Sequence, residues 1–423
     1  MPAGAQSTAQ LPLQFDFLPP GARSTGMGAA FVAVADDATA AFTNPAGLGR
    51  RTRREISGEL RVRSLETRFL TGGRISGAVT GVGLDTVPGP VYGQDLDRQY
   101  GPSFASVLWP VLGATVTGYA HRVAAIENAF YNQGVFERIT SNGLPEDRNR
   151  ENPIGGDRRI AINAYGLSVG HRGFRNLSIG AGVALYSFSA RGDFARYGID
   201  GNFAGPVNRG RMDATATQRG DDWSPGFNLG ALYDIQPRLT AGIAFRRGPA
   251  FTFSQRDRIP SLAYDNTRVG RFKVPDVLSA GLDWRPLDSL RVALDVNRVR
   301  HSQLVADFIT FQALASSRPG QLRLDDGSEL HVGAELLPSG APMQLALRAG
   351  FWRDPDHVVR YEPTPAQDEV DTLYRATLPG GTAQSHVTFG AGLAPTRRIE
   401  LNVAADLSGR TTHVTFSTIF RFD

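Results

Sequence analysis

Residues 177–186 read LSIGAGVALY, and their side chains alternate strictly between two faces of an extended chain. Leu177, Ile179, Ala181, Val183 and Leu185 are apolar and share one face, while the intervening positions are mostly small or polar. Successive side chains of a β-strand point to opposite faces of the sheet. The stretch therefore predicts a strand with one continuous apolar face.

The same alternation recurs along the chain. Other apolar faces are formed by Leu278, Ala280, Leu282 and Trp284; Leu290, Val292, Leu294 and Val296; and Ile399, Leu401, Val403 and Ala405. Polar side chains occupy the opposite faces: His331, Glu335, Gln344, Arg348, His386 and Thr388. About eleven residues rising about 3.3 Å each, tilted near 40°, cover about 25 to 28 Å, the height of the apolar band of an outer-membrane barrel. We expect the apolar face to contact lipid.

The connections between these strands alternate in length from residue 110 onward. Short turns rich in Pro, Gly, Asn and Asp lie at residues 110–113, 171–176, 234–237, 285–288, 337–342 and 394–397. Long polar connections lie at residues 124–158, 191–222, 254–273, 301–326 and 354–381. A soluble sandwich also has alternating strands, but it does not sort short and long connections onto alternate positions. Transmembrane barrels do, with short periplasmic turns and long extracellular loops.

The strand count follows from the turns. The predicted strands after residue 103 are 103–109, 112–123, 159–170, 177–190, 223–234, 239–253, 274–285, 289–300, 328–337, 343–353, 384–394, 398–408 and 411–422. Bacterial barrels have an even number of strands, and residues 56–63 supply one more. Residues 75–84 are expected to extend the first hairpin above the membrane. We predict an all-β fold, a transmembrane antiparallel barrel of about 14 strands over residues 53–423.

Aromatic residues fit this arrangement. Trp109 and Trp284 precede short turns, and Trp223 and Trp352 adjoin long loops, so two tryptophans are expected at each membrane interface. The alternative is scattered core tryptophans. The chain ends with alternating aromatics up to Phe422, a pattern that resembles the signal read by the outer-membrane assembly machinery, although an aromatic is normally the final residue.

Composition narrows the class of protein. The 423 residues include 48 glycines and no cysteine, and the net charge is +4. No apolar run approaches eighteen residues, which argues against transmembrane helices. The lack of cysteine removes disulfides and thiolate metal sites. The basic residues are almost all arginines spread over loops and lumen-facing positions, so we expect carboxylates and lipopolysaccharide phosphates as their neighbours and no nucleic acid.

The chain does not begin with a complete secretion signal, because PAGAQ follows Met1 without a basic or an apolar region. We interpret it as a near-mature or truncated outer-membrane chain, with a cytoplasmic origin as the alternative. Residues 1–20 are interpreted as an N-terminal extension.

Residues 21–52 are not strand-like, because small residues dominate them. Asp36 and Asp37 precede an Ala-rich stretch that can form one short helix capped by a carboxylate. Pro45 cannot continue this helix and biases Asn44 to an extended conformation, so residues 44–47 predict a rigid corner. Because a barrel of this size is too wide to fill with its own side chains, we predict that residues 21–52 form a hatch in the lumen.

Several motifs resemble those of the FadL-type long-chain fatty-acid transporters of outer membranes, whose superfamily includes PorV-like barrels. They are the small-residue run from Gly21, ADDA at residues 35–38 and NPAGL at residues 44–48. Residues 102–107 before the turn at Pro110 and VPDVL at residues 274–278 match as well. The resemblance covers residues 21–422 and does not identify the substrate.

The resemblance implies a mechanism in which extracellular loops capture a hydrophobic molecule, the hatch gates the lumen, and the cargo leaves sideways through a gap in the wall. It implies a kinked third strand near residues 113–123, where Gly113 and Gly118 are candidates for the gap and ordinary strand glycines are the alternative. The residues assigned to the hatch and its gating are Asp36, Asp37, Asn44, Pro45 and Ala46.

Ligand capture has several candidate residues. The apolar and aromatic loop residues are Ile126, Phe130, Tyr131, Phe136, Phe194 and Phe203, which either line an apolar entrance or pack the loops onto one another. An anionic head group would need a cation. The candidate cations are Arg122, Arg196, Arg246 and Arg348.

Enzyme activity is not expected. GLSVG at residues 166–170 matches the nucleophile-elbow pattern but lies within a predicted strand, and the histidines show no metal-ligand spacing, so no cofactor or metal is expected. Two functions remain. The first is passive uptake of long-chain fatty acids or other hydrophobic molecules; the alternative is a PorV-like barrel that docks secreted or envelope proteins. A polar porin is weaker, since the hatch would obstruct flow.

Overall fold

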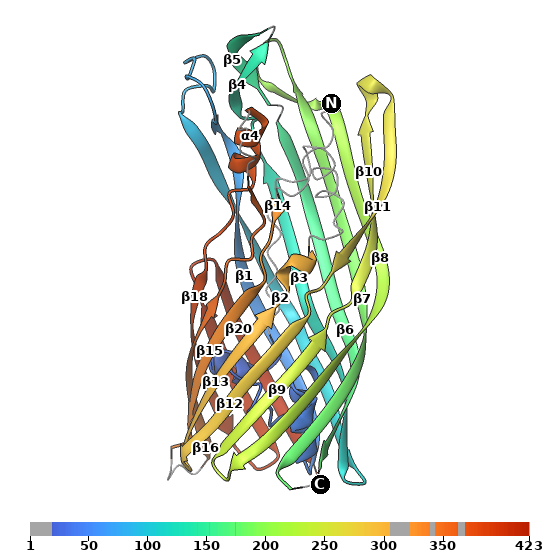
Figure 1. The fold of residues 1–423 in the computed structure, drawn as a ribbon, viewed down its shortest axis with the longest axis vertical. Helices are drawn as coiled ribbons and strands as arrows, with labels where there is room; N and C mark the ends of the chain where they lie inside the picture. The colour runs from blue at the N-terminus through green and yellow to red at the C-terminus, as the bar shows by residue number, and fades with distance from the viewer. Residues whose placement is uncertain are drawn as a thin grey trace.

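The computed structural model describes residues 19–141, 143–151, 153–173, 175–304, 322–338, 343–362 and 369–422. Within them, fourteen antiparallel strands close into a barrel, because β1 pairs with both β2 and β20 (Figure 1). The barrel strands, in order around the wall, are β1 (Arg54–Arg74), β2 (Gly89–Val111), β3 (Ala114–Tyr131), β6 (Ile154–Arg172), β7 (Leu177–Ile199), β8 (Val207–Gln236), β9 (Leu239–Arg247), β12 (Val277–Leu287), β13 (Leu290–Val299), β15 (Gly327–Leu336), β16 (Gln344–Asp354), β18 (Gln384–Ala394), β19 (Ile399–Leu407) and β20 (Thr411–Phe422).

The short turns lie where the sequence predicts them, all at the lower end of the barrel in Figure 1. The predicted long connections differ, because much of their length is strand. β7 and β8 continue through most of residues 191–222, and residues 254–273 contribute to a hairpin of β10 (Ala250–Ile259) and β11 (Tyr264–Lys273). The other elements of this upper end are β4 (Phe136–Ser141), β5 (Leu144–Arg150), η3 (Pro260–Leu262), η4 (His301–Leu304), β14 (Leu322–Arg323), β17 (Arg360–Tyr361) and α4 (Glu369–Thr377).

The first hairpin also differs from the prediction. Residues 75–84 do not extend it; its own strands β1 and β2 continue upward to Arg74 and Gly89, and residues 75–88 connect them. The upper parts of these strands mix charged residues with scattered apolar ones such as Phe69 and Leu70, so the apolar period is weaker there in the sequence.

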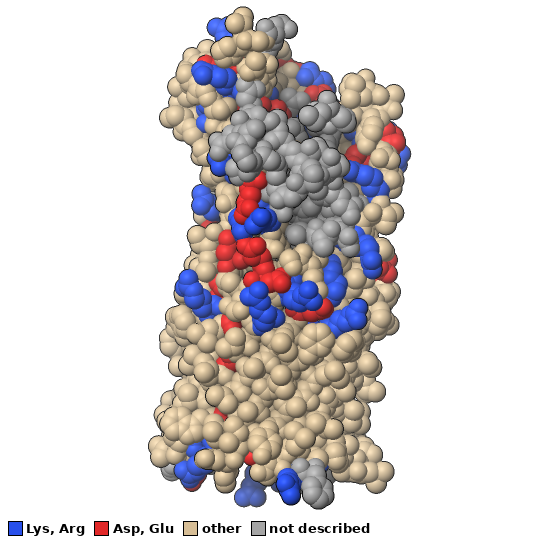
Figure 2. All heavy atoms as spheres, viewed as in Figure 1, with Lys and Arg blue, Asp and Glu red and all other residues tan. Residues whose placement is uncertain are grey.

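Side-chain alternation in the lower barrel agrees with the prediction. Ile179 and Val183 of β7 are 51% and 65% exposed, whereas Ser178 of the same strand is buried. The lower half of the face seen in Figure 2 is accordingly almost free of charged atoms, which gather at mid-height, above it and along the lower edge. This apolar belt suits a lipid environment. Separately, no helix among the described residues is long and apolar enough to cross a membrane.

Three of the four tryptophans face outward, as the predicted interface positions require. Trp109, Trp223 and Trp284 are exposed on the outer surface of the wall. Trp352 instead faces the lumen, where its Nε1 donates to Asp406 at 2.9 Å. Its parity along β16 places it on the inner face, which adjacency to a loop does not reveal.

The N-terminal segment lies inside the lower barrel, drawn in blue in Figure 1. It contains α1 (Ala22–Gly26), α2 (Ala40–Thr43) and the 3-10 helix η2 (Pro45–Arg50). Asn44 is extended, with φ −144°, as expected before Pro45. The predicted carboxylate cap is wrong: Thr39 is the N-cap of α2 and makes no side-chain cap hydrogen bond, while Asp37 accepts from the Thr39 amide at 2.9 Å.

Glycines of the wall make room for the hatch backbone. At each of them an added Cβ would lie at or below 3.0 Å from a hatch atom, a separation that side chains do not tolerate. We call them the glycine belt: Gly170, Gly180, Gly230, Gly242, Gly333, Gly350 and Gly390. Several pair directly across neighbouring strands, such as Gly170 with Gly180 and Gly180 with Gly230. The hatch is therefore seated backbone against backbone over β6–β9 and β15–β18.

Candidate functional site

A network of buried charges fixes the first part of the hatch to the wall. Arg23 of α1 donates from Nε and Nη2 to Glu335 of β15 at 2.8 and 2.7 Å. Arg23 also pairs with Asp36, which accepts from Arg291 of β13 at 2.8 Å. Arg348 of β16 donates to the same Glu335 at 2.7 Å. Because these groups are mostly buried and hydrogen-bonded, loss of one leaves uncompensated charge.

The two predicted hatch carboxylates behave differently. Burial opposes ionisation of Asp36, but the charges of Arg23 and Arg291 outweigh it and hold its pKa well below the usual range. Burial raises the pKa of Asp37 to about 6, since Arg23 and the hydrogen bond from Thr39 offset the desolvation only in part. Asp36 therefore anchors the hatch as an anion, whereas Asp37 is held more readily in its neutral form.

The predicted corner at Asn44 is the second anchor. The fully buried Asn44 side chain donates from Nδ2 to the Val32 carbonyl at 2.8 Å and accepts from the Ala46 amide at 3.2 Å. Its Oδ1 lies against Gly230, while Pro45 and Ala46 lie against Gly180. The Asn-Pro-Ala element thus joins two parts of the hatch and seats them on the glycine belt.

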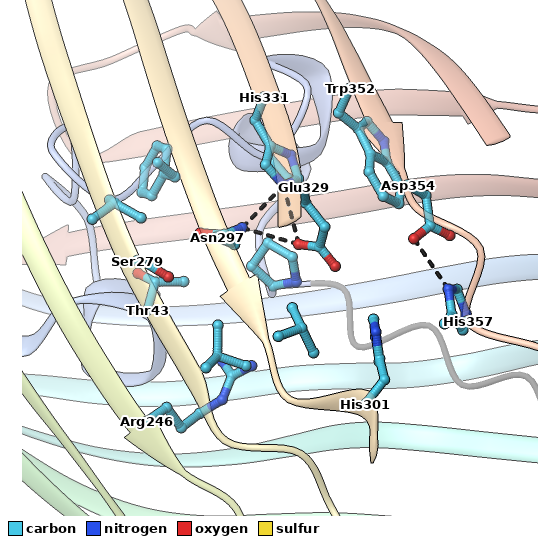
Figure 3. A pocket seen from close by; sticks show the side chains of 16 residues that line it. Thr43, Arg246, Ser279, Asn297, His301, Glu329, His331, Trp352, Asp354 and His357 are labelled. Carbon is cyan, nitrogen blue, oxygen red and sulfur yellow. Dashed lines mark hydrogen bonds and ion pairs between the residues drawn. The ribbon is translucent and has the colours of Figure 1, made fainter. Parts of the chain in front are cut away.

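Above the hatch, a cavity of about 80 Å³ opens between its Ala29–Val32 part and the wall of β9–β16 (Figure 3). The wall of the cavity carries polar groups among apolar ones: Glu329 accepts from Asn297 at 3.1 Å and contacts the His331 ring at 3.2 Å. His357 lies 3.2 Å from Asp354. No group of three or more side chains suited to hold a metal ion occurs in the described residues.

Arg246 of β9 points into the same cavity (Figure 3). Its guanidinium lies 4.5 Å from the centre of the Phe42 ring of the hatch. Within the described part of the chain, no carboxylate forms an ion pair with it. A cation stacked on an aromatic ring and open to a cavity is suited to an anion.

The opposite side of the lumen is apolar and aromatic. Phe42 lies 4.6 Å from the His121 ring and 6.1 Å from the Tyr119 ring, centre to centre, and Phe104 stacks on Tyr119 at 6.1 Å. The buried cluster containing these residues continues upward through Phe188 to the β10–β11 hairpin. It therefore forms an apolar lining from the extracellular end to the hatch.

The wall is interrupted between β2 and β3. Their backbone pairing runs from Val111 and Ala114 only as far as Phe104 and His121. Above this point β2 pairs with β1 alone and β3 with β6 alone. Each strand carries an extra residue at the break, Ser103 on β2 and Val123 on β3, where the register with its other neighbour shifts. Such bulges re-aim a strand and end its pairing.

Side chains bridge the upper part of this interruption. Asp97 accepts from the Glu127 amide at 3.0 Å, and Asp95 accepts from the Ala129 amide at 3.1 Å. Arg63 of β1 donates to the Ala125 carbonyl at 3.1 Å. We call the unpaired stretch, residues 95–103 of β2 and 122–129 of β3, the seam. Side-chain hydrogen bonds there replace a β-ladder.

A recess of about 50 Å³ lies in the seam. It is lined by Arg61, Arg63, Gln99, Tyr100, Gly101, Pro102, Ser103, Arg122, Val123, Ala124, Ala125 and His413. Gly101 has φ +142° and Pro102 has no amide hydrogen, so neither suits a continued ladder. Val123 and Ala124 belong also to the apolar lining, which therefore reaches the seam.

The glycines predicted for the gap lie below the seam. Gly113 is in the β2–β3 turn with φ +83°, and Gly118 pairs with Val107 in an unbroken stretch. The irregularity begins farther along the same strand, after Arg122. The sequence signal that could have located it is Gly101-Pro102, since proline interrupts a strand ladder and glycine allows the bend.

The predicted ligand residues form separate clusters. Phe130 and Phe194 lie 6.2 Å apart with Phe69, and Phe136 and Phe203 lie 6.2 Å apart in another group. The remaining two differ again: Ile126 belongs to the apolar lining, and Tyr131 stacks with Tyr197 and Arg209. The structure thus does not bring all of them to one site.

Of the predicted cations, Arg348 lies beside the hatch and is bonded to Glu335 and Asn402, away from the loop aromatics. A cation not predicted from the sequence, Arg158, lies 5.4 Å from the Phe194 ring and is 3% exposed. Its Nε and Nη1 find no hydrogen-bond partner in the described residues. A buried guanidinium in this state is costly unless an anion joins it.

Comparison with known families gives one match. The model for the outer membrane protein transport protein family (OMPP1/FadL/TodX) matches residues 140–414. Comparison with curated proteins gives no match.

Solved structures share the fold. A FadL homologue of Pseudomonas aeruginosa superposes with a TM-score of 0.62 at 14% identity, covering 98% of this chain and 99% of the other. The toluene transporter TodX of P. putida gives 0.61 at 14% identity, covering 96% and 99%. The Ralstonia pickettii toluene transporter TbuX gives 0.57 at 14% identity, covering 96% and 100%. At such identities the likeness concerns the fold.

Proposed function

The chain belongs to the outer membrane protein transport protein family (OMPP1/FadL/TodX), and we propose from this premise that it takes up hydrophobic molecules and releases them sideways through the seam. Capture by the extracellular loops, gating by the hatch and lateral exit are the steps of this proposal. The proposed transport is passive and uses no cofactor.

The observation that carries the proposal is the seam. The β2–β3 pairing stops at Phe104 and His121, and the apolar lining reaches the same place through Val123. The outer surface there lies at the edge of the apolar belt, since Val107 and Leu167 below it are 49% and 55% exposed. A hydrophobic molecule leaving here would pass from an apolar lumen toward lipid without crossing water.

On this proposal the hatch closes the route until it moves. Phe42 packs on Tyr119 and His121, directly below the seam, and the cavity on its other side holds only about 80 Å³. A long acyl chain needs more space, so passage requires the Phe42 region of the hatch to move. The charge network around Arg23 holds the other part of the hatch in place meanwhile.

Within this function we propose long-chain fatty acids, or other amphiphiles with an anionic group, as cargo. Arg158 lies beside Phe194, two residues along β6 from Ile160 of the apolar lining, and Arg246 lies over Phe42 at the hatch end of that lining. Neither has a carboxylate partner among the described residues. The toluene transporters of the same fold are named for a neutral hydrocarbon, which carries no charge to neutralise a buried guanidinium.

The seam can be closed by a reversible cross-link, because the chain has no cysteine of its own. Gln99→Cys and Ala125→Cys place one thiol on each side of the recess. A reducible bifunctional reagent joining them should abolish uptake of a labelled long-chain fatty acid, and reduction should restore it. Normal uptake by the cross-linked protein would rule out exit through the seam.

The matched control joins two strands that already pair. Ala161→Cys and Ser189→Cys lie opposite each other on β6 and β7, so their cross-link leaves the wall unchanged and uptake should continue. The choice of cargo is tested separately: Arg158→Gln should lower uptake of the fatty acid and leave uptake of toluene unchanged.

A further inference from the structure

A second cavity lies at the extracellular rim, apart from the cavity above the hatch. β1 pairs with β20 only as far as Leu65 and Thr411, so one edge of β1 above Leu65 lacks that neighbour. Residues 377–382 and Val358–Val359 cover this edge, and the space between them is a cavity of about 260 Å³. We call it the rim pocket; it is larger than the cavity above the hatch, at about 80 Å³.

The interior of the rim pocket is apolar. Its walls include Phe69, Tyr92, Val358, Val359, Leu378 and Pro379. An apolar cavity of about 150 Å³ holds a benzene molecule, so the rim pocket has room for a fused ring or a short branched chain. Apolar walls with a few polar groups at the mouth are typical of small-molecule sites.

The pocket is held open by hydrogen bonds between segments far apart in the sequence. Tyr92 donates to the Ala376 carbonyl at 2.9 Å, and the Tyr361 amide donates to the Leu378 carbonyl at 3.1 Å. The Gly381 amide donates to Asp356 at 3.1 Å, and the Glu66 amide to the Arg410 carbonyl at 2.9 Å. The walls are therefore preformed, and a ligand would not have to order them.

Two guanidinium groups mark the mouth of the pocket. Arg68 lies 4.8 Å from the centre of the Tyr92 ring, and Arg410 also lines the pocket. Neither side chain forms an ion pair with a carboxylate in the described part of the structure. The one carboxylate at the mouth, Glu66, accepts from Gln94 at 2.6 Å. The positive charge is thus available to a ligand.

We propose that the rim pocket binds a small amphiphile, with a ring or short branched chain inside the pocket and a carboxylate between Arg68 and Arg410. This goes beyond uptake through the lumen, because the site lies between the β1 edge and the segment after α4. Binding at this site does not depend on passage through the seam. The ligand class is an aromatic or branched carboxylate, since a ring or a short branched chain fits a volume of about 260 Å³.

The test is calorimetric titration of the purified full chain in detergent with 1-naphthoate and with its neutral isostere 1-naphthamide. Replacing both cations, Arg68→Gln with Arg410→Gln, should weaken naphthoate binding at least tenfold and leave naphthamide binding unchanged. Thr382→Trp, at the exposed mouth, should abolish binding of both. Arg271→Gln on β11 is the matched control and should change neither.

Two results would overturn the proposal: no heat of binding with the unmodified protein, or naphthoate binding that survives both the double arginine change and Thr382→Trp. The second would place the ligand elsewhere, including the lumen. Cross-linking the seam through Gln99→Cys and Ala125→Cys should leave naphthoate binding intact, which separates the rim pocket from failure or success of the uptake route.

Discussion

The glycine belt and the seam are two parts of one barrel wall with opposite structures. At the belt, glycines let the hatch backbone approach the strands, and the ladder between Gly170, Gly180 and Gly230 is unbroken. At the seam the ladder is absent, and Asp95 and Asp97 supply the missing acceptors. Both places depend on Gly or Pro. The belt seats the hatch, and under the proposed function the seam is the part of the wall that opens.

The difference indicates which parts of this barrel can move at a low cost in free energy. Separating paired strands breaks a cooperative row of backbone bonds, whereas parting the seam breaks a few side-chain bonds that water can replace. Lifting the hatch from the belt breaks close packing and a buried charge network. We therefore expect the seam to open at lower cost than the hatch undocks as a whole.

The largest effect is expected from filling the belt. Gly230→Val places a side chain where the buried Asn44 side chain lies, so Asn44 must give up its hydrogen bonds to Val32 and Ala46, and hatch docking should weaken by more than about 3 kcal/mol. The hatch should become sensitive to protease and the conductance of the protein in a planar bilayer should rise.

Gly58→Val is the matched control, because an added Cβ at Gly58 meets no atom within 4 Å. Both variants should keep the heat-dependent gel migration of a folded barrel. A protected hatch in Gly230→Val would mean that the belt does not hold it.

The charge network comes next. Arg23→Met removes the shared partner of Glu335 and Asp36, which should loosen the hatch by about 3 to 5 kcal/mol. Hydrogen exchange of residues 21–28, followed by mass spectrometry, should rise accordingly. Arg238→Met, which breaks an exposed pair with Asp288, should leave this exchange unchanged. Equal exchange in both variants would contradict an anchoring role.

The sequence predicts those features of the belt and the seam that depend on neighbouring residues, and not those that depend on contacts between distant segments. Turns such as residues 234–237 and the alternation around Ile179 are local, so they predict the barrel and its fourteen strands. The belt is not local: Gly180 resembles any strand glycine until the hatch is placed against it. These glycines alternate with lipid-facing residues, so they occupy lumen-facing positions of their strands. That placement is the sequence pattern from which the belt could have been predicted.

The candidate site was predicted in part for the same reason. NPAGL at residues 44–48 marks the hatch, because proline and asparagine fix the backbone locally. Arg246 was one of four candidate cations and Arg158 was not named, since only the register of β6 and β9 shows which arginines face the lumen without a partner. Phe130 and Phe194 were named, but their pairing arises from strands distant in sequence.

An intermediate effect is expected from pH. Because the pKa of Asp37 is raised to about 6 in the docked hatch, the docked state holds the proton more tightly than the undocked chain does. Docking is then strongest below about pH 4, weakens by roughly 3 kcal/mol as the pH rises to about 6, and is constant above it. Asp36, whose pKa is lowered, titrates below this window.

Hydrogen exchange of residues 30–48, corrected for the intrinsic pH dependence of exchange, should show this loss between pH 4 and 6. Asp37→Asn keeps an acceptor for the Thr39 amide and removes the proton, so its docking should not vary over the window. A variant that retained the full pH dependence would assign the titration to another group.

The smallest change in free energy, and the one closest to function, is expected at the seam. Asp97→Ala with Asp95→Ala removes the acceptors of the Glu127 and Ala129 amides, at a cost of about 1 kcal/mol each because both sites are partly open to water. So small a loss leaves the barrel folded but widens the seam, and the initial rate of fatty-acid uptake should rise several-fold. Asp193→Ala is the matched control: it removes an exposed carboxylate on β7, where the ladder with β6 and β8 is intact, so uptake should not change. If the two changes gave the same uptake rate, the side-chain hydrogen bonds across the seam would not limit passage. The proposal that the seam opens more easily than the hatch undocks would then be wrong.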